Sequence, residues 1–293
     1  MSPQLVVGRP RLADFVELTK PRITLMVVLT AGIGALLGTA GELPPLLVLH
    51  ALLGTAMVSA GASALNQVLE RDTDARMRRT ADRPIPAGRL SAGTGWAFSL
   101  VISTLGVVYL GLAVNWLCAA LGLAALLSYV LLYTPLKRSS SLSTLVGAVP
   151  GAVPPMMGWA AVSGRLDPGA WALFGILFFW QLPHFFAIAW LLRDEYGEAG
   201  FPMVPVVDTD GGRTARQMIF YSLLLLPVSL LPTWLGLAGP VYLVGATALG
   251  LVLLALTIDF GRRRTRPAAR RVMRFSILYL PAVLAVLLLD RAI

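Results

Sequence analysis

The chain has few residues that could form cross-links or bind soft metal ions. Its 293 residues include one cysteine, Cys118, and two histidines, His50 and His184. A single cysteine excludes an intramolecular disulfide and a paired-cysteine redox motif. With so few thiol and imidazole groups, a zinc or iron site of the usual kind is not expected. Any bound metal should therefore be one that prefers oxygen ligands.

Charged residues are scarce as well. They make up 13% of the chain, whereas a soluble domain carries about 25%. Hydrophobic residues make up 57%, and the mean hydropathy is +0.75. These values are typical of a membrane protein. Residues 1–19 lack the short apolar core and small-residue cleavage site of a secretory signal, so no cleavable signal is expected.

Long apolar segments recur along the chain, each near the roughly 20 residues that a spanning helix needs. The fold class predicted is an all-α membrane protein, with residues 1–293 as a single domain and residues 1–20 as an N-terminal tail. Nine spanning helices are expected, at approximately 23–41, 44–67, 95–113, 116–134, 143–162, 170–192, 217–236, 239–259 and 273–290. Helix breakers interrupt the fifth segment at 149–155, which is tolerated where backbone is buried or lines a cavity.

Basic residues fall mainly at one end of these segments. All but two of the 24 Lys and Arg residues lie in the N-terminal tail or in the second, fourth, sixth and eighth connections. Excess Lys and Arg mark the cytoplasmic side of a membrane protein. The pattern predicts a multi-pass protein of the bacterial inner membrane with its N-terminus in the cytoplasm. It also explains the net charge of +9 without a nucleic-acid partner.

A polar stripe follows the second apolar segment. Asn66, Glu70 and Asp74 are four residues apart, so on a helix they project from one face over about 12 Å. Three oxygen-bearing side chains in one stripe repel one another unless a cation lies among them. Mg²⁺ usually binds one or two carboxylates and keeps phosphates and waters in its other positions. Asp72 would point to roughly the opposite side of such a helix.

A second acidic cluster, formed by Asp194, Glu195 and Glu198, follows the sixth segment on the same predicted side. Basic residues accompany both clusters, and Arg matches phosphate oxygens in pairs. The basic residues that could hold a diphosphate are Arg79, Arg83, Lys137 and Arg138. Two such clusters on one side are poorly explained by membrane topology alone. They indicate a site where a divalent metal and a polyanion meet.

His184 follows Pro183 inside the sixth apolar segment. It could ligate a metal or pair with a polar group in the interior, and the residues leave both readings open. His50 precedes Asn66 by sixteen residues, about 24 Å along a helix, so it is not expected in the acidic site.

The first acidic motif resembles that of the UbiA-type intramembrane prenyltransferases, and the acidic sixth connection resembles their second motif. Further stretches are similar to one branch of this family, the protohaem IX farnesyltransferases. These stretches are 19–22, 79–84, 133–138, 154–159, 180–184 and 201–207. They follow the family order and spacing over about residues 12–290. Glu70 departs from the pattern, because Asp is commoner there in the superfamily.

The resemblance implies nine helices around a central cavity and a Mg²⁺-dependent prenyltransferase. The implied reaction moves a farnesyl group from farnesyl diphosphate to a vinyl group of haem B with addition of water, which gives haem O. Haem B is then a substrate, and Mg²⁺ is the cofactor. The implied partners are farnesyl diphosphate, haem B, membrane lipid, and a haem A synthase or terminal oxidase assembly.

The same resemblance implies roles for individual residues. Tyr133 joins the diphosphate contacts, and His184 becomes a candidate contact to haem. The implied metal ligands are Asn66, Glu70, Asp72, Asp74, Asp194, Glu195 and Glu198. The implied catalytic residues are Asn66, Glu70, Asp74, Asp194 and Glu198.

Two alternatives stay open. The first is a UbiA-type enzyme acting on a quinone precursor or a chlorophyll-like tetrapyrrole, against which the 19–22 and 180–184 stretches argue. The second is a transporter, since transporters also have broken helices and charges within the membrane. Against a transporter, the carboxylates lie near one face of the membrane rather than at its midplane.

Overall fold

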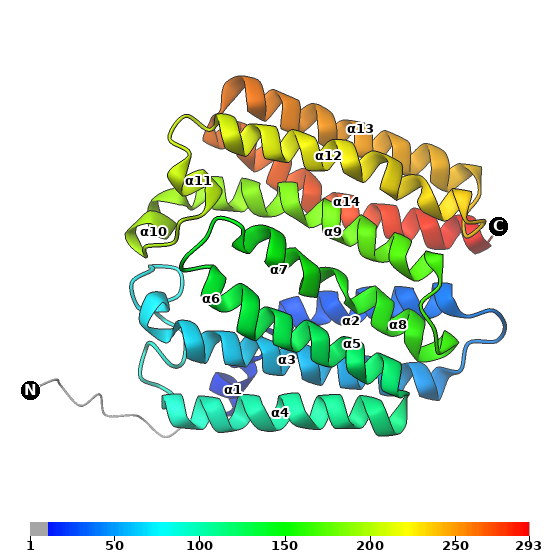
Figure 1. Cartoon of the computed structure of the whole chain (residues 1–293), viewed down its shortest axis with the longest axis horizontal. Coiled ribbons are helices and arrows are strands. Elements are labelled where there is room, and N and C mark those ends of the chain that lie inside the picture. Colours follow the sequence, from blue (N-terminus) through cyan, green and yellow to red (C-terminus); the bar gives the residue numbers. More distant parts are fainter. Residues whose placement is uncertain (1–10, 293) are drawn as a thin grey trace, which may run out of the picture.

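The computed structural model describes residues 11–292, and these form a bundle of long helices (Figure 1). Within this part of the chain nine helical segments are long and apolar enough to cross a membrane. The spans are α2 (Pro21–Gly38), α3 (Pro45–Asp74), α4 (Ala92–Ala113), α5 to α6 (Trp116–Leu136), α7 with α8 (Ser143–Ser163), α9 (Pro168–Leu191), α12 (Gly212–Trp234), α13 (Pro240–Arg263) and α14 (Arg266–Ala292). The predicted nine-helix membrane bundle is confirmed.

Several predicted boundaries were wrong. The second span was expected to end at residue 67, but α3 continues without a break to Asp74. The ninth was expected to begin at residue 273, whereas α14 begins at Arg266. Both errors have one cause, because apolarity alone set the predicted ends. A helix that leaves the hydrocarbon region can continue through polar residues where those residues find partners.

Part of the predicted tail, residues 1–10, lies outside the described residues. The remainder is structured, because α1 (Leu12–Leu18) packs against α3. Leu18 is fully buried, and the side-chain amide of Gln67 donates to its carbonyl at 2.9 Å. The Arg89 guanidinium donates to the Asp14 carboxylate at 2.8 Å and holds the pKa of that carboxyl below its usual value.

One end of the bundle carries the connections 75–91, 137–142, 192–211 and 264–265, and we call it the basic end. Figure 1 shows the α3–α4 connection at this end together with the short helices α10 (Arg193–Glu198) and α11 (Val204–Val207). The two acidic stretches of the sequence therefore meet at the same end of the molecule. The opposite end has short connections and, among residues 11–292, holds only Arg165 and Arg291 of the basic side chains.

The fifth span is broken, as its helix breakers predict. It consists of α7 (Ser143–Ala152) and α8 (Pro154–Ser163), which meet at Val153. Pro154 and Pro155 have no N–H group, so the regular hydrogen-bond ladder stops at this point. The side-chain amide of Gln181 on α9 donates to the carbonyl of Ala148 at 2.6 Å and ties the broken span to the next one.

Helices α2 and α8 approach closely because glycine faces backbone at their crossing. A Cβ atom on Gly158 would overlap the carbonyl oxygen of Ala31, and one on Gly34 would overlap that of Pro155. In a membrane no hydrophobic driving force holds helices together, so close backbone packing through small residues has a larger share in their association.

We expect Gly158→Ala to destabilise the bundle, because the added methyl group forces α2 and α8 apart. Overpacking of this kind costs about 1–3 kcal/mol. The measurement is the thermal midpoint of the detergent-purified protein. Gly41→Ala is the matched control, since a Cβ there has no neighbour within 4 Å. Equal midpoints for the two variants would contradict the close packing.

Candidate active site

The last two and a half turns of α3 carry a buried polar stripe. Asn66, Glu70 and Asp74 are 3%, 2% and 3% exposed. Their four-residue spacing on a continuous helix places them on one face, as the sequence predicted. Two carboxylates and an amide are thus withdrawn from water at the basic end. Buried charges of this kind need partners.

Each member of the stripe is paired with a cation from another segment. The Lys20 ammonium donates to Asn66 Oδ1 at 3.2 Å. The Lys137 ammonium lies 3.1 Å from both carboxylate oxygens of Glu70.

The third pair joins Arg83 to Asp74 at 2.5 Å. The Arg83 guanidinium comes from the α3–α4 connection, whereas Lys20 precedes α2 and Lys137 follows α6 (Thr134–Leu136). Three distant pieces of chain thus supply positive charge to one helix face. The arrangement suits a polyanion that arrives with a metal ion, since the same groups can then share the anion's oxygens.

Lys20 reaches the stripe through an unusual backbone conformation. It has φ of 48° and directly precedes Pro21, the first residue of α2. The left-handed conformation costs a non-glycine residue roughly 1–2 kcal/mol. The Thr24 hydroxyl donates to the carbonyl of Thr19 at 2.8 Å and closes the turn. Burial, and then repulsion by Arg83, lower the pKa of Lys20 from 10.5 to about 8.

Thr134 fixes the orientation of the Asn66 amide. The Thr134 hydroxyl donates to the carbonyl of Tyr129 at 2.9 Å, so its oxygen accepts from Asn66 Nδ2 at 3.2 Å. Asn66 Oδ1 is thereby turned toward Lys20, which has only donors. Thr134 carries no charge, and it influences the site by orienting the Asn66 side chain.

A π-helical turn places Thr134 and Lys137. The segment η1 (Ser128–Tyr133) follows α5 (Trp116–Leu127), and the Thr134 N–H bonds five residues back to Tyr129. The wider turn stacks the rings of Tyr129 and Tyr133 with centroids 5.1 Å apart. Gly147 makes room for Tyr133, because a Cβ there would meet the ring at 2.6 Å. Such turns are frequent at functional sites.

The three acidic side chains of α10 lie in different surroundings. Asp194 and Glu198 are exposed, and Asp194 pairs with Arg266 at 3.3 Å. Both line a pocket at the surface of the basic end. Glu195 differs, because its Oε2 atom is buried and has no hydrogen-bond partner among the described residues. A buried carboxylate oxygen without a partner is costly unless something else binds it.

The two acidic connections are in contact. Met77 from the α3–α4 connection packs in one buried cluster with Tyr196, Phe201 and Met203 from the sixth connection. The Lys137 ammonium, which bonds Glu70, also lies 4.5 Å from the ring centroid of Phe201. Lys137 therefore touches both halves of the predicted site.

Other predicted residues lie farther from this centre. Asp72 is exposed beside Arg71, on the opposite side of α3 as expected, and Arg79 is exposed. The Arg138 guanidinium turns outward and donates to the carbonyl of Leu69 at 2.7 Å. His184 lies within α9, where its Nδ1 is 2.8 Å from the Ser276 hydroxyl of α14 and its ring stacks on Trp180.

The donor set fits a hard divalent ion. Among the described residues no three His, Cys, Asp or Glu side chains gather closely enough to hold a metal by themselves. Mg²⁺ does not require this, because it usually binds one or two carboxylates together with substrate phosphates. Glu70, Asp74 and the amide of Asn66 supply such a set, and the orphaned oxygen of Glu195 is a further candidate.

Sequence reasoning missed Lys20 and Thr134 as parts of the site. Both stood inside stretches that carried the family resemblance, 19–22 and 133–138, yet neither received a role. The signal that could have found them was a cationic side chain in 19–22 and a hydroxyl side chain in 133–138. Their partners lie 46 and 68 residues away in the chain, so only the fold reveals the contacts.

Comparison with known proteins gives a consistent result. The model of the UbiA prenyltransferase family matches residues 27–279. The chain is 47% identical over 287 residues to a protoheme IX farnesyltransferase of Solibacter usitatus, covering 95% of this chain and 98% of the relative. It is 46% identical to one of Koribacter versatilis, covering 99% and 98%.

Solved structures share the fold at lower identity. A structure of digeranylgeranylglyceryl phosphate synthase superposes with a TM-score of 0.80 at 18% identity, covering 96% of this chain and 98% of the other. A UbiA homolog from Archaeoglobus fulgidus bound to DMAPP and Mg²⁺ gives a TM-score of 0.67 at 15% identity, covering 94% and 99%.

We expect Lys137→Met to destabilise the protein by about 3–5 kcal/mol, because it leaves the buried Glu70 carboxylate without its cation. The double variant Lys137→Met/Glu70→Gln should recover much of this loss, since no uncompensated charge remains. The thermal midpoints of the two single variants and the double variant measure the coupling. Additive losses would show that the pair contributes nothing.

Proposed function

Because the chain belongs to the UbiA prenyltransferase family, we propose that it transfers a farnesyl group from farnesyl diphosphate to a vinyl group of haem B. Water is added in the same reaction, and the products are haem O and diphosphate. The observation that carries the proposal is the buried stripe of Asn66, Glu70 and Asp74 with its three cations. Relatives named protoheme IX farnesyltransferase, 41% to 47% identical, support the choice of substrates.

We further propose Mg²⁺ as the cofactor, supported by the UbiA homolog that holds Mg²⁺ together with DMAPP. Asn66, Glu70 and Asp74 would hold one ion and Glu195 a second, and these ions would supply positive charge against the leaving diphosphate. Lys20, Arg83 and Lys137 pair with the same face of α3 and would bind the diphosphate oxygens. Tyr133 and Arg79 stay proposed contacts to the diphosphate.

Within the second acidic cluster we give the larger role to Glu195. Its Oε2 is buried and unpaired, whereas Asp194 and Glu198 are exposed and Asp194 already pairs with Arg266. A carboxylate that stays in water gains little by binding a metal at the buried stripe. Asp194 and Glu198 would act on substrate entry at the surface of the basic end.

The surroundings of the stripe suit an allylic cation. Ionisation of the farnesyl C–O bond produces a carbocation that water would quench, and the three stripe residues are at most 3% exposed. The haem vinyl group is the nucleophile that must reach it. We propose His184 as a contact to haem. Since its Nδ1 faces Ser276, Nε2 is the ring nitrogen left for that contact.

The protein is an integral, multi-pass membrane protein. We propose that it resides in a bacterial inner membrane with the basic end in the cytoplasm, since Lys and Arg concentrate there. Farnesyl diphosphate would then reach the site from the cytoplasmic side. A haem A synthase or a terminal oxidase assembly would be the partner that takes up the product.

The test uses purified protein with farnesyl diphosphate and haem B, and mass spectrometry of the haem product. We expect haem O and free diphosphate, no product with EDTA, and recovery when Mg²⁺ is added. Product formation that EDTA does not affect would exclude the metal mechanism. An aromatic quinone precursor serves as a competing acceptor, and its preferential prenylation would assign the protein to another branch of the family.

Replacement of the acids of α10 tests their unequal roles. We expect Glu195→Gln to lower the rate of haem O formation by roughly 100-fold, the scale of losing one charge-stabilising group. Glu198→Gln is the matched control on the same helix and should change the rate by less than about tenfold. The reverse order would place Glu198 in the site and Glu195 outside it.

A further inference from the structure

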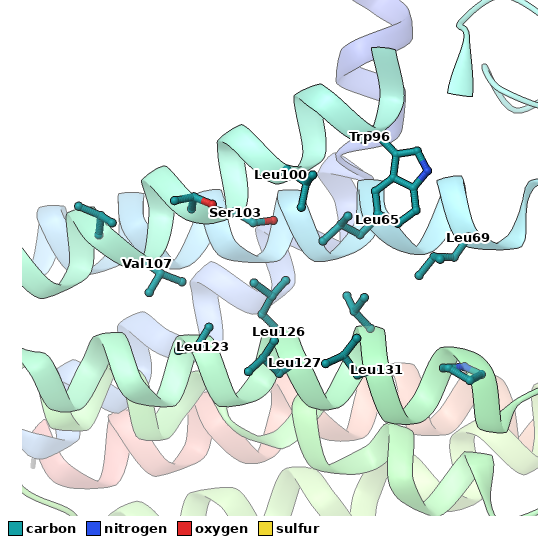
Figure 2. A pocket seen from close by; sticks show the side chains of 14 residues that line it. Leu65, Leu69, Trp96, Leu100, Ser103, Val107, Leu123, Leu126, Leu127 and Leu131 are labelled. Carbon is teal, nitrogen blue, oxygen red and sulfur yellow. The ribbon is translucent and has the colours of Figure 1, made fainter. Parts of the chain in front are cut away.

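A groove runs along the outside of the bundle between α4 and the span formed by α5, η1 and α6 (Figure 2). Its volume is about 490 Å³. Leucine, valine, tryptophan and proline line it together with Ser103 and Thr104. The groove opens toward the region of lipid, because Leu100, Leu127 and Leu131 on its walls are 51%, 44% and 61% exposed. Such an apolar cleft suits a hydrocarbon chain and offers few hydrogen-bonding groups to a polar ligand.

The groove is separate from the acidic stripe. Two neighbouring residues of α3 point to different sides, because Glu70 pairs with Lys137 in the stripe and Leu69 lines the groove. The same division holds after η1, where Lys137 turns inward and Arg138 turns outward. The seam between α3 and the end of the fourth span therefore divides the groove from the catalytic side.

Arg138 lies at the basic end of the groove. Its Nη2 donates to the carbonyl of Leu69 at 2.7 Å, and both Leu69 and Pro135 belong to the groove wall. No carboxylate within residues 11–292 forms a salt bridge with this guanidinium, and the side chain is exposed. The Arg138 guanidinium, which has no acidic partner among the described residues, thus lies where the groove meets the membrane surface.

Trp96 lies at the same end, close to Leu69 in Figure 2. Its indole N–H donates to no other group in the described part of the chain, while its ring forms part of the wall. Tryptophan in this position is typical of the boundary between hydrocarbon and headgroups. From the basic end inward the groove therefore offers a guanidinium, an indole N–H and then a largely apolar wall in which Ser103 and Thr104 are the polar side chains.

We propose that this groove binds one anionic phospholipid. An acyl chain lies along the leucine and valine wall, the indole N–H of Trp96 faces the ester region, and the phosphodiester pairs with Arg138. Charge complementarity selects the occupant. A zwitterionic lipid presents its own cation beside the phosphate, whereas an anionic lipid leaves the attraction of Arg138 uncancelled. The site is distinct from the binding of farnesyl diphosphate and does not depend on it.

The experiment is native mass spectrometry of the full-length, delipidated protein titrated with phosphatidylglycerol or phosphatidylcholine of the same acyl chains. We expect one phosphatidylglycerol to remain bound preferentially. Arg138→Gln should weaken its binding roughly fivefold, the effect of about one Arg at a membrane surface. Arg270→Gln, an exposed arginine at the same end without an ion pair among the described residues, should leave binding unchanged.

A second pair of variants tests the groove itself. Thr104→Trp fills the groove and should abolish the preferred lipid, whereas Leu105→Trp, the next residue of α4, lies outside the lining and should have no effect. Equal binding of the two lipids, or equal loss in each variant and its control, would overturn the proposal. Displacement of phosphatidylglycerol by a non-hydrolysable farnesyl diphosphate analogue would overturn it too, since the groove would then hold the prenyl tail.

Discussion

The two carboxylates at the end of α3 must be neutralised, and much of the basic end is arranged around that requirement. Burial of Glu70 and Asp74 without partners would cost several kcal/mol per charge. The fold brings Lys137 and Arg83 to them from separate connections and Lys20 to the adjacent Asn66. The left-handed turn before α2, the π-helical turn and the loop after α3 all serve to place these cations.

The sequence predicted the helices and the first acidic stripe because both follow from local periodicity. Nine apolar segments and a four-residue spacing can be read without knowledge of any neighbour. The pairing of the stripe residues with particular cations could not be predicted in this way. Lys20 and Lys137 meet their partners across 46 and 67 residues, and only packing of the spans decides which cation reaches which oxygen.

The second acidic cluster shows why spacing alone has limits. Asp194 and Glu198 are four residues apart and so share a face of α10, whereas the buried oxygen without a partner belongs to Glu195. Helix α9 ends at Leu191, and the next residue, Leu192, has φ of −108° and ψ of 15°, outside the helical region, so α10 starts afresh. The rotational phase of α10 is thus independent of the span before it. The sequence shows which residues share a face but not which face points inward.

The π-helical turn of η1 has a consequence for how this protein can change. A π-helical turn contains one more residue than an α-helical turn, so it rotates all that follows by about 100° relative to an uninterrupted helix. Thr134 and Lys137 meet Asn66 and Glu70 only with that rotation in place. Loss or gain of a single residue within η1 would turn both contacts away. The length of η1 thus matters to the site as much as the identities of Thr134 and Lys137 do.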